Sequence, residues 1–456
     1  MSHYKPDPNK NVSLTIDGMP VTVPEGTRIL EAARKVNVHI PTLCDHPDLC
    51  KRALCRLCVV ECDGKGKLLA ACANDVWEGV NIITNNLRIL TIRKTIVEML
   101  LASHPQECLT CIRSTNCELQ TLSEYLLIRE QTHSRDETGR KAPVTESNVL
   151  VRDGAKCVKC GRCIEACQEV QTIRAINSSH RGIHYSVSTP YHQELADGPC
   201  VFCGQCAEVC PVGAIYEHEQ TADVWAEINK KNNNAVIQFD PDSCNAVNDA
   251  LGLPQGSVTG GKTVAALRRM GFAKVYNARS VTGRIYAAEN RELAKRKDSG
   301  GSLPLITGCS AGVFKFVENN YPDLKDRLLN YRNGQETLAD ITGGSGSPVM
   351  SVMAAPCIAL KYRSAQSMPV LTIRELARML ALAGINFGSL PESPFDSIPG
   401  AEAEEPRQQF KTLTVSGFSG ARAALDSVRK GECGASLVRI MSCPRSIRPD
   451  CPFSGM

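Results

Sequence analysis

The first hundred residues show the alternation typical of strands and then the spacing typical of helices. Apolar residues occupy alternate positions between Val12 and Val23, on both sides of Asp17-Gly18, which predicts a β-hairpin that turns at this dipeptide. A helix is predicted around residues 28 to 36. Apolar residues recur at helical spacing from Leu87 to Leu101 and predict a connecting helix. This part of the chain therefore predicts a mixed sheet packed on one helix, with a cysteine-rich loop after it.

The rest of the chain divides into a polar stretch, a cysteine-dense stretch and a longer half with α/β alternation. Residues 130 to 146 are polar and include Pro143, which indicates a linker, and the cysteine-dense module occupies residues 147 to 222. Beyond Glu227 the pattern predicts amphipathic helices near residues 263–270, 372–383 and 421–429. It also predicts a glycine-rich loop at residues 342–348. At roughly 150 residues per domain, the length indicates about three domains.

Charge and hydropathy exclude several classes of partner. The formal net charge is +4 over 456 residues and there is no long Lys/Arg run, so neither nucleic acid nor a charged membrane surface is expected as a partner. The apolar stretch from Leu87 to Leu101 contains four charged residues and is not expected to cross a bilayer. No secretory signal pattern is visible at the N-terminus, which predicts a cytoplasmic protein.

The cysteine content is the unusual feature of the composition. There are 23 cysteines, and most of them crowd into short C-x2-C runs. Runs of this kind are better suited to metals than to disulfides, although a disulfide framework is the alternative explanation.

The first cysteine set has the pattern C-x10-C-x2-C-x13-C and consists of Cys44, Cys55, Cys58 and Cys72. A long loop that supplies three of four thiolates, placed behind a β-hairpin, is typical of plant-type two-iron ferredoxins. Zinc is the competing ligand. The set resembles the N-terminal domain of FeFe-hydrogenases and of the large iron-sulfur subunit of respiratory complex I.

The second set has the pattern H-x3-C-x2-C-x5-C and consists of His104, Cys108, Cys111 and Cys117. Both families named above carry a four-iron cluster with one histidine and three cysteines at this spacing, so the resemblance implies such a cluster here. A zinc knuckle with the same four ligands is the alternative.

The third pattern, C-x2-C-x2-C-x3-C, occurs twice and the second copy is followed by Pro211. In paired modules of this kind the fourth cysteine of each run binds the other cluster. The predicted ligand sets are therefore Cys157, Cys160, Cys163 and Cys210 for one four-iron cluster, and Cys167, Cys200, Cys203 and Cys206 for the other. Several clusters in one chain make sense as a relay of single electrons, with no substrate pocket required.

The second half of the chain resembles the catalytic domain of FeFe-hydrogenases. The resemblance is carried by GLPQGSVTGGKTVAALRRMGFAKVY (252–276), PLITGCSAGVFKFVENNYPDL (304–324), AAPCIALKY (354–362), LTIRELARMLALAGINF (371–387) and VRIMSCP (438–444). That family holds a six-iron active site with four cysteines. Three of these positions are kept, as Cys309, Cys357 and Cys443.

The resemblance also implies which parts of that active site are lost. The fourth cysteine position is Ile447, the proton-carrying thiol is Ser310, and the lysine that holds a cyanide ligand is Leu360. Arg363 occupies the position of an acid of the proton path. Residues 445 to 450 replace the glycine-rich segment that follows the last cysteines in that family. A hydroxyl is a much weaker acid than a thiol, so Ser310 is a poor proton relay. The diiron centre and hydrogen chemistry are therefore expected to be absent.

The retained cysteines leave two alternatives. In the first, they bind one more four-iron cluster together with Cys451 or Cys433, which would be the fifth cluster of the chain. In the second, they are metal-free core cysteines. Cys50, Cys62 and Cys244 are interpreted as structural thiols.

The predicted fold is multidomain α+β. It comprises a β-grasp two-iron domain (10–90), a four-iron module with one histidine and three cysteine ligands (91–130), a two-cluster ferredoxin module (147–222) and a truncated FeFe-hydrogenase-like α/β domain (228–456). The predicted cofactors are one two-iron and three four-iron clusters, with a fourth four-iron cluster as the open question.

The whole chain resembles the A subunit of the Sporomusa-type (Stn) electron-bifurcating transhydrogenases of anaerobes. This resemblance implies an electron-transfer subunit without catalysis of its own. Its implied partners are an FMN- and NADH-binding iron-sulfur subunit, an NADP(H)-linked subunit and ferredoxin. No G-x-G-x-x-G follows a predicted strand, which agrees with nucleotide sites on partner subunits. The alternatives are an active FeFe-hydrogenase with unusual ligands and a relay subunit of a formate dehydrogenase or complex I-like assembly.

Overall fold

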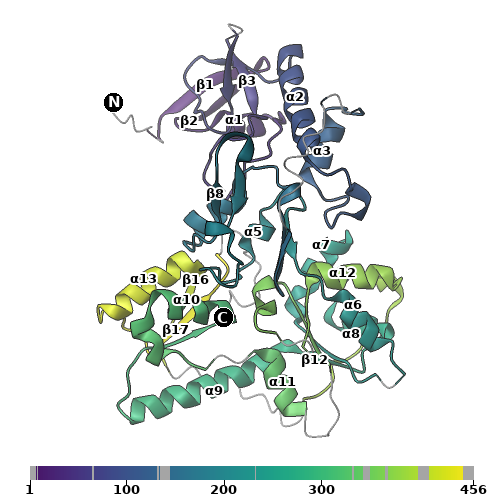
Figure 1. The fold of residues 1–456 in the computed structure, drawn as a ribbon, viewed down its shortest axis with the longest axis vertical. Coiled ribbons are helices and arrows are strands. Elements are labelled where there is room, and N and C mark those ends of the chain that lie inside the picture. Colours follow the sequence, from purple (N-terminus) through teal and green to yellow (C-terminus); the bar gives the residue numbers. More distant parts are fainter. Residues whose placement is uncertain are drawn as a thin grey trace.

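The computed structural model describes residues 7, 9–63, 66–130, 133, 144–231, 233–330, 333–342, 350–364, 368–398 and 410–444. The molecule is elongated (Figure 1), with the N-terminal sheet at one end, two α/β lobes at the other end and the cysteine-rich module between them.

The N-terminal domain is a five-stranded mixed sheet packed on one helix. Its strands run in the order β2-β1-β5-β3-β4, with bounds β1 Asn11–Ile16, β2 Met19–Pro24, β3 Val59–Cys62, β4 Lys67–Ala70 and β5 Asn81–Ile83. Ile16 pairs with Met19 across Asp17 and Gly18, both of which have positive φ, as a tight hairpin turn requires. The helix α1 (Ile29–Lys35) buries its apolar face in the same core. The predicted hairpin and helix are therefore confirmed.

Two helices lead from this domain toward the middle of the molecule. The predicted connecting helix is present as α2 (Leu87–Ser103), and it starts where the Asn86 side chain accepts a hydrogen bond from the Ile89 amide. Arg93 of α2 is 1% exposed and donates to the carbonyls of Leu57 and Val59. These bonds attach α2 to the loop that carries the first cysteine set. A shorter helix, α3 (Glu118–Tyr125), follows.

The cysteine-rich module has little regular structure. It contains a three-stranded antiparallel sheet in the order β10-β7-β6 and a separate β8-β9 hairpin, with bounds β6 Val144–Glu146, β7 Leu150–Asp153, β8 Asn177–Ser179, β9 Ser186–Ser188, β10 Ile215–Glu217, α4 Arg162–Glu165 and α5 Gln205–Glu208. Residues 144–146, at the end of the predicted linker, form a strand because they pair in register with β7. Residues 134–143 of that stretch lie outside the described residues.

The second half consists of two lobes, each built on a parallel sheet. The first sheet has the order β12-β11-β14-β15 and the second β13-β17-β16, with strand bounds β11 Val236–Phe239, β12 Lys274–Asn277, β13 Leu305–Gly308, β14 Ser351–Ala355, β15 Val370–Thr372, β16 Thr412–Ser416 and β17 Leu437–Met441. The helices are α6 Thr221–Ile228, α7 Cys244–Leu251, α8 Gly260–Met270, α9 Ala278–Asp298, α10 Ala311–Asn320, α11 Gly334–Thr342, α12 Ile373–Leu382 and α13 Gly417–Arg429.

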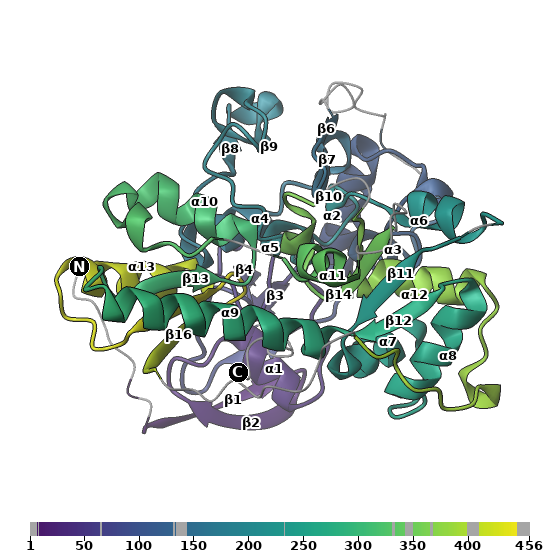
Figure 2. The same ribbon diagram turned by 90° about the horizontal axis from the view of Figure 1, so that it is seen from below.

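The helices of this half divide between the lobes. Helices α6, α7, α8 and α12 bury their apolar faces with the first sheet, whereas α10 and α13 do so with the second. The long helix α9 runs along both lobes (Figure 2). The three helices predicted here are confirmed as α8, α12 and α13. The predicted glycine-rich loop begins at the end of α11 and otherwise lies outside the described residues.

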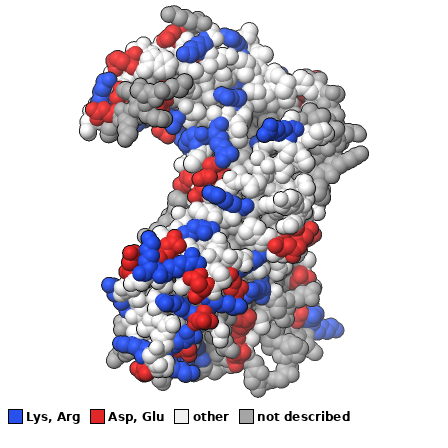
Figure 3. Space-filling model, turned by 60° about the vertical axis from the view of Figure 1, so that its left-hand side comes forward, with Lys and Arg blue, Asp and Glu red and all other residues white. Residues whose placement is uncertain are grey.

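Within the described ranges, no helix combines the length and the apolar character needed to span a bilayer. Positive and negative side chains are interspersed on the face shown in Figure 3, most densely over the two lobes. This mixture agrees with the small net charge of the chain.

Candidate iron-sulfur sites

The first cysteine set lies on the long loop before β3 and on the turn after β4. The Cys55 amide donates to Cys44 Sγ at 3.4 Å, and the Sγ atoms of Cys58 and Cys72 are 3.3 Å apart. Within each pair the hydrogen bond lowers the pKa of one thiol, Cys44 or Cys58, and raises the pKa of its partner, Cys55 or Cys72. Each thiol pair therefore shares a proton, which iron would displace because it binds thiolates, and in this sense the arrangement fits the predicted two-iron cluster.

The second set, which forms the His104 site, joins the end of α2 to the start of α3. His104 immediately follows α2, and Cys117 immediately precedes α3. Burial lowers the pKa of His104, and its buried Nδ1 has no hydrogen-bond partner among the described residues. A neutral imidazole is the form that binds metal. Burial raises the pKa of Cys117, with smaller contributions from Cys111 and Cys108, which places these three thiols in one neighbourhood.

The third set surrounds one small cavity in the middle module. Cys157, Cys160, Cys163 and Cys210 all line it, together with apolar side chains that include Val187 of β9. Burial raises the pKa of Cys160 to about 12 and that of Cys163 well above the usual range. Buried thiolates are costly unless a metal supplies positive charge, so this site also fits an iron-sulfur cluster.

The fourth set lies between the middle module and the second lobe. Burial raises the pKa of Cys203 and Cys206, and the nearby thiols of Cys200 and Cys167 add to both shifts. The amides of Ala175 and Phe202 donate to the sulfurs of Cys167 and Cys200 at 3.2 and 3.4 Å. Backbone N–H groups directed at sulfur are typical of four-iron sites.

Direct contacts connect the first three sites. A methyl group on Gly213 would lie 2.8 Å from Cys111 Sγ, so the His104 site packs closely against the Cys210 loop. The Glu118 amide donates to the Pro211 carbonyl at 3.0 Å. A methyl group on Gly161, which has φ +80°, would lie 2.9 Å from Leu54 in the two-iron loop. Both N-terminal sites therefore adjoin the site of Cys157, Cys160, Cys163 and Cys210.

The fourth site adjoins the third, because Cys206 packs in one cluster with Cys163 and Cys210, and it also adjoins the second half of the chain. A methyl group on Gly204 would lie 2.9 Å from Ile358 Cβ, next to Cys357. The ring of Phe202 stacks on Tyr362 at a centroid distance of 4.6 Å, and Lys315 Nζ of α10 lies 5.6 Å from the Phe202 centroid.

The three retained cysteines of the second half follow the carboxyl ends of β13, of β17 in the same sheet, and of β14 in the first sheet. Cys357 Sγ and Cys443 Sγ are 4.0 Å apart, and Cys309 Sγ lies 3.1 Å from Ser442 Oγ. Cys433, one candidate for the fourth ligand, packs in a different apolar cluster with α10 and α13. The other candidate, Cys451, lies outside the described residues, as does Ile447.

Ser310 and Leu360, two positions at which the resemblance implies replaced residues of the diiron site, lie among the described residues near these cysteines. Ser310 is completely buried, and its hydroxyl donates to Ser442 Oγ at 3.3 Å. Leu360 packs in one apolar cluster with Cys357 and Cys443. The side chain of Leu360 carries no hydrogen-bond donor.

An ion pair occupies the cavity next to Cys309. This inner cavity, of about 80 Å³, is lined by Cys309, Leu360, Glu289 and Arg439. The Glu289 carboxylate accepts from Arg439 Nη2 and from Thr307 Oγ1, each at 2.6 Å. Sequence reasoning missed Glu289 and Arg439, because nothing in their local pattern distinguishes them from ordinary surface charges.

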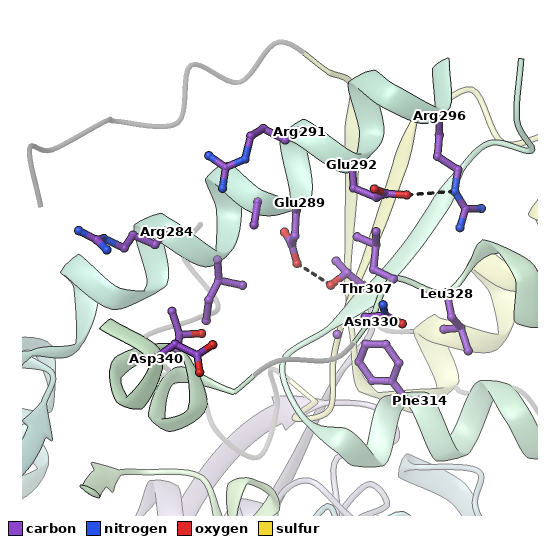
Figure 4. A pocket seen from close by; sticks show the side chains of 15 residues that line it. Arg284, Glu289, Arg291, Glu292, Arg296, Thr307, Phe314, Leu328, Asn330 and Asp340 are labelled. Atoms are coloured by element: carbon purple, nitrogen blue, oxygen red, sulfur yellow. Dashed lines mark hydrogen bonds and ion pairs between the residues drawn. The ribbon is translucent and has the colours of Figure 1, made fainter. Parts of the chain in front are cut away.

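A larger cavity of about 420 Å³ lies on the outer side of the same pair, between α9, β13 and α11. Figure 4 shows Glu289 directed from α9 toward Thr307, and Glu292 directed toward Arg296 one turn further on. Glu289 and Thr307 line both cavities.

The cysteines interpreted as structural thiols differ in burial. Cys62 and Cys244 are buried, and Cys244 Sγ lies 3.9 Å from Thr263 Oγ1. Cys50, in the two-iron loop, is exposed and does not pack in the core.

Family models match the chain in four successive regions. They are the 2Fe-2S iron-sulfur cluster binding domain over residues 9–87, the NADH-ubiquinone oxidoreductase-G iron-sulfur binding region over 93–132, the 4Fe-4S dicluster domain over 156–214 and the C-terminal domain of the iron only hydrogenase large subunit over 233–408. The fold and the sites thus define a multidomain iron-sulfur protein that ends in a hydrogenase-like domain.

Three curated relatives are similar to this chain, and the first of them shows its family. The chain is 35% identical to the NADP-reducing hydrogenase subunit HndD of Solidesulfovibrio fructosivorans, over 86% of this chain and 72% of that protein. It is 27% identical to iron hydrogenase 1 of Clostridium pasteurianum, over 85% and 71%. It is 34% identical to the G 2 subunit of the NADH-quinone oxidoreductase of Rhizobium meliloti, over 45% and 24%. The chain belongs to the HndD-like family of iron-sulfur hydrogenase subunits.

Proposed function

We propose that this protein is the iron-sulfur relay subunit of a soluble, cytoplasmic, flavin-based electron-bifurcating transhydrogenase. It transfers single electrons between flavin subunits and ferredoxin and makes no hydrogen itself. The observation that carries the proposal is a contiguous series of four cysteine-rich sites that ends at a hydrogenase-like domain, in which Ser310 and Ile447 stand where the resemblance implies cysteines. The clusters, when bound, supply the one-electron redox steps, and the chain's own residues position and insulate them.

The contacts between sites support a forked relay. The two-iron loop and the His104 site both pack against the site of Cys157, Cys160, Cys163 and Cys210. The site of Cys167, Cys200, Cys203 and Cys206 then adjoins the second half through Gly204 and Ile358. Electrons from two N-terminal entry points would therefore meet in the middle module before they reach the second half.

The partners follow from the chemistry that the chain lacks. Its sequence has no strand-borne dinucleotide fingerprint, so an FMN- and NADH-binding iron-sulfur subunit and an NADP(H)-linked subunit are expected to carry those cofactors. Relatives named as subunits of an NADP-reducing hydrogenase and of an NADH-quinone oxidoreductase support this direction. Ferredoxin is the proposed low-potential partner.

The retained cysteines of the second half are proposed to hold an additional four-iron cluster. Cys309, Cys357 and Cys443 would supply three ligands, and Cys451 is the proposed fourth. The 4.0 Å separation of Cys357 Sγ and Cys443 Sγ supports a shared role for these two thiols. Metal-free core cysteines are the competing explanation.

Anaerobic purification of the chain with its native partners tests the proposal. About 14 irons per chain are expected from one two-iron and three four-iron clusters, and about 18 if the additional cluster is present. FMN-containing subunits are expected to copurify with the chain. The complex is expected to reduce pyridine nucleotide in a ferredoxin-dependent reaction. Infrared bands of iron-bound carbonyl and cyanide, or hydrogen evolution, would contradict it in favour of a hydrogenase. Copurification of a molybdenum or membrane subunit would favour a formate dehydrogenase or complex I-like assembly.

Replacing His104 with Cys is expected to keep a four-iron cluster but lower its midpoint potential. A thiolate is anionic where imidazole is neutral, and added negative charge disfavours the reduced state. A redox titration followed by electron paramagnetic resonance measures the shift. An unchanged potential together with altered zinc content would refute the assignment of His104 as a cluster ligand.

A further inference from the structure

One buried arginine lies where three of the cysteine-rich sites meet. Arg162 stands between Cys160 and Cys163, and its side chain is only 6% exposed. Its Nη1 and Nη2 donate to the two carboxylate oxygens of Glu118 at 2.6 and 2.8 Å, next to Cys117 of the His104 site. Its Nη2 also donates to the Asp45 carbonyl at 2.8 Å, next to Cys44 of the two-iron loop. A single guanidinium therefore lies beside all three sites at the fork.

The charge of this guanidinium is incompletely compensated by the protein. Its counter-ion, Glu118, has a side chain that is 45% exposed, so water screens the carboxylate much more than the buried cation. The neighbouring Asp45 carboxylate pairs with Lys51 at 3.0 Å and Arg34 at 3.4 Å instead. Glu165, the buried carboxylate on the same helix, pairs with Arg52. The cysteine thiolates, and the clusters they would bind, add further negative charge at this junction.

One donor of the guanidinium, Nε–H, has no acceptor among the described residues. The Nε of Arg162 is buried and makes no hydrogen bond to any described residue. A buried, unpaired N–H costs about 1–3 kcal/mol, so such a group calls for an explanation. Arg162 stands between two ligands of the third site and donates to the backbone beside Cys44, so the third site and the two-iron loop both lie within electrostatic range of the cation.

We propose that Arg162 tunes the fork of the relay: its fixed positive charge, with Nε–H as a donor to cluster sulfur, raises the potential of the four-iron cluster held by Cys157, Cys160, Cys163 and Cys210. It raises that of the two-iron cluster to a smaller extent. Reduction adds negative charge to a cluster, and a nearby cation stabilises that charge. Electrons from either entry point are therefore collected in the middle module. This inference rests on the relay proposed above.

The electrostatic role makes a prediction about sign that a purely structural role does not make. Replacing Arg162 with Met removes a cation and is expected to lower the midpoint potential of the four-iron cluster. The equilibrium constant for its reduction should fall at least tenfold, which corresponds to about 59 mV for one electron. Replacing Glu118 with Gln removes an anion and is expected to raise the same potential, by less, because Glu118 is half exposed. Arg162→Lys keeps the charge and loses Nε–H, so an intermediate shift is expected. Loosened packing would move all three variants in one direction.

The measurement is an anaerobic redox titration of the full chain, followed by electron paramagnetic resonance, with iron content determined on the same samples. Arg296→Gln serves as the control, because this arginine lies on α9 and pairs with Glu292, away from the cysteine-rich sites. It should leave every potential unchanged. Arg162→Met and Glu118→Gln shifts of equal sign, or no shift with all clusters present, would overturn the inference. Wild-type protein without clusters would contradict the relay itself, which is a distinguishable result.

Discussion

Replacing Cys206 with Ala is expected to remove one four-iron cluster and to destabilise the whole cysteine-rich module. Cys206 lies on the short helix α5, and burial together with the thiols of Cys203, Cys200 and Cys167 raises its pKa strongly. Without a metal these buried thiols stay neutral and contribute only small apolar contacts. With a cluster bound, the metal-ligand bonds contribute directly to the free energy of folding. Iron content should fall by about four per chain, which is from about 18 to about 14 with the proposed additional cluster.

The consequence for electron transfer should be an interruption rather than a slower rate. Cys206 belongs to the site that adjoins the second half, so the N-terminal clusters should still be reduced by dithionite but no longer exchange electrons with an additional cluster beyond the gap. Cys244→Ala is the matched control, because Cys244 is also buried but packs in the apolar core of the first lobe. It should leave iron content unchanged. Equal iron loss in both variants would indicate general unfolding and would contradict the ligand assignment of Cys206.

The sequence predicted local structure well where spacing alone determines it. The hairpin around Asp17-Gly18 forms because only a tight turn with positive φ joins two strands across two residues. The clustering of Cys157, Cys160 and Cys163 follows from their positions on one short segment. Their association with Cys210 was predicted from a known pairing rule, and the structure places all four around one cavity.

Long-range packing could not be predicted from the sequence in the same way. Arg162 lies between two cysteines, and the sequence around it does not indicate its partners. Its contacts with Glu118 and Asp45 depend on how three modules pack. The pairing of Glu289 with Arg439 joins residues 150 positions apart. Position in the motif gave a signal for Arg162, because any residue between two ligands lies near the cluster, whereas Arg439 offered none.

Replacing Lys361 with Met is expected to cost about 3–5 kcal/mol of stability, because it leaves the charge of Glu375 buried without its partner. Both side chains of this pair are completely buried, with Lys361 Nζ 2.8 Å from Glu375 Oε1. Lys361 Nζ also donates to the His218 carbonyl at 2.6 Å, at the end of β10. The pair thus fastens the turn after Cys357 to α12 and to the cysteine-rich module.

A double-mutant cycle separates the charge effect from lost packing. Burial lowers the pKa of Lys361 despite the attraction of Glu375, which means that the ion pair only partly offsets the cost of removing the cation from water. Lys361→Met combined with Glu375→Gln should therefore be more stable than Lys361→Met alone, since no unpaired charge remains.

Urea unfolding can be followed by fluorescence of Trp225, which packs against the first lobe, in a Trp77→Phe background. Arg429→Met, which breaks the exposed pair of Arg429 with Asp323, should leave the unfolding transition almost unchanged. If the two single variants and the double variant were additive, the buried pair would not be coupled, and Lys361 would act by packing alone.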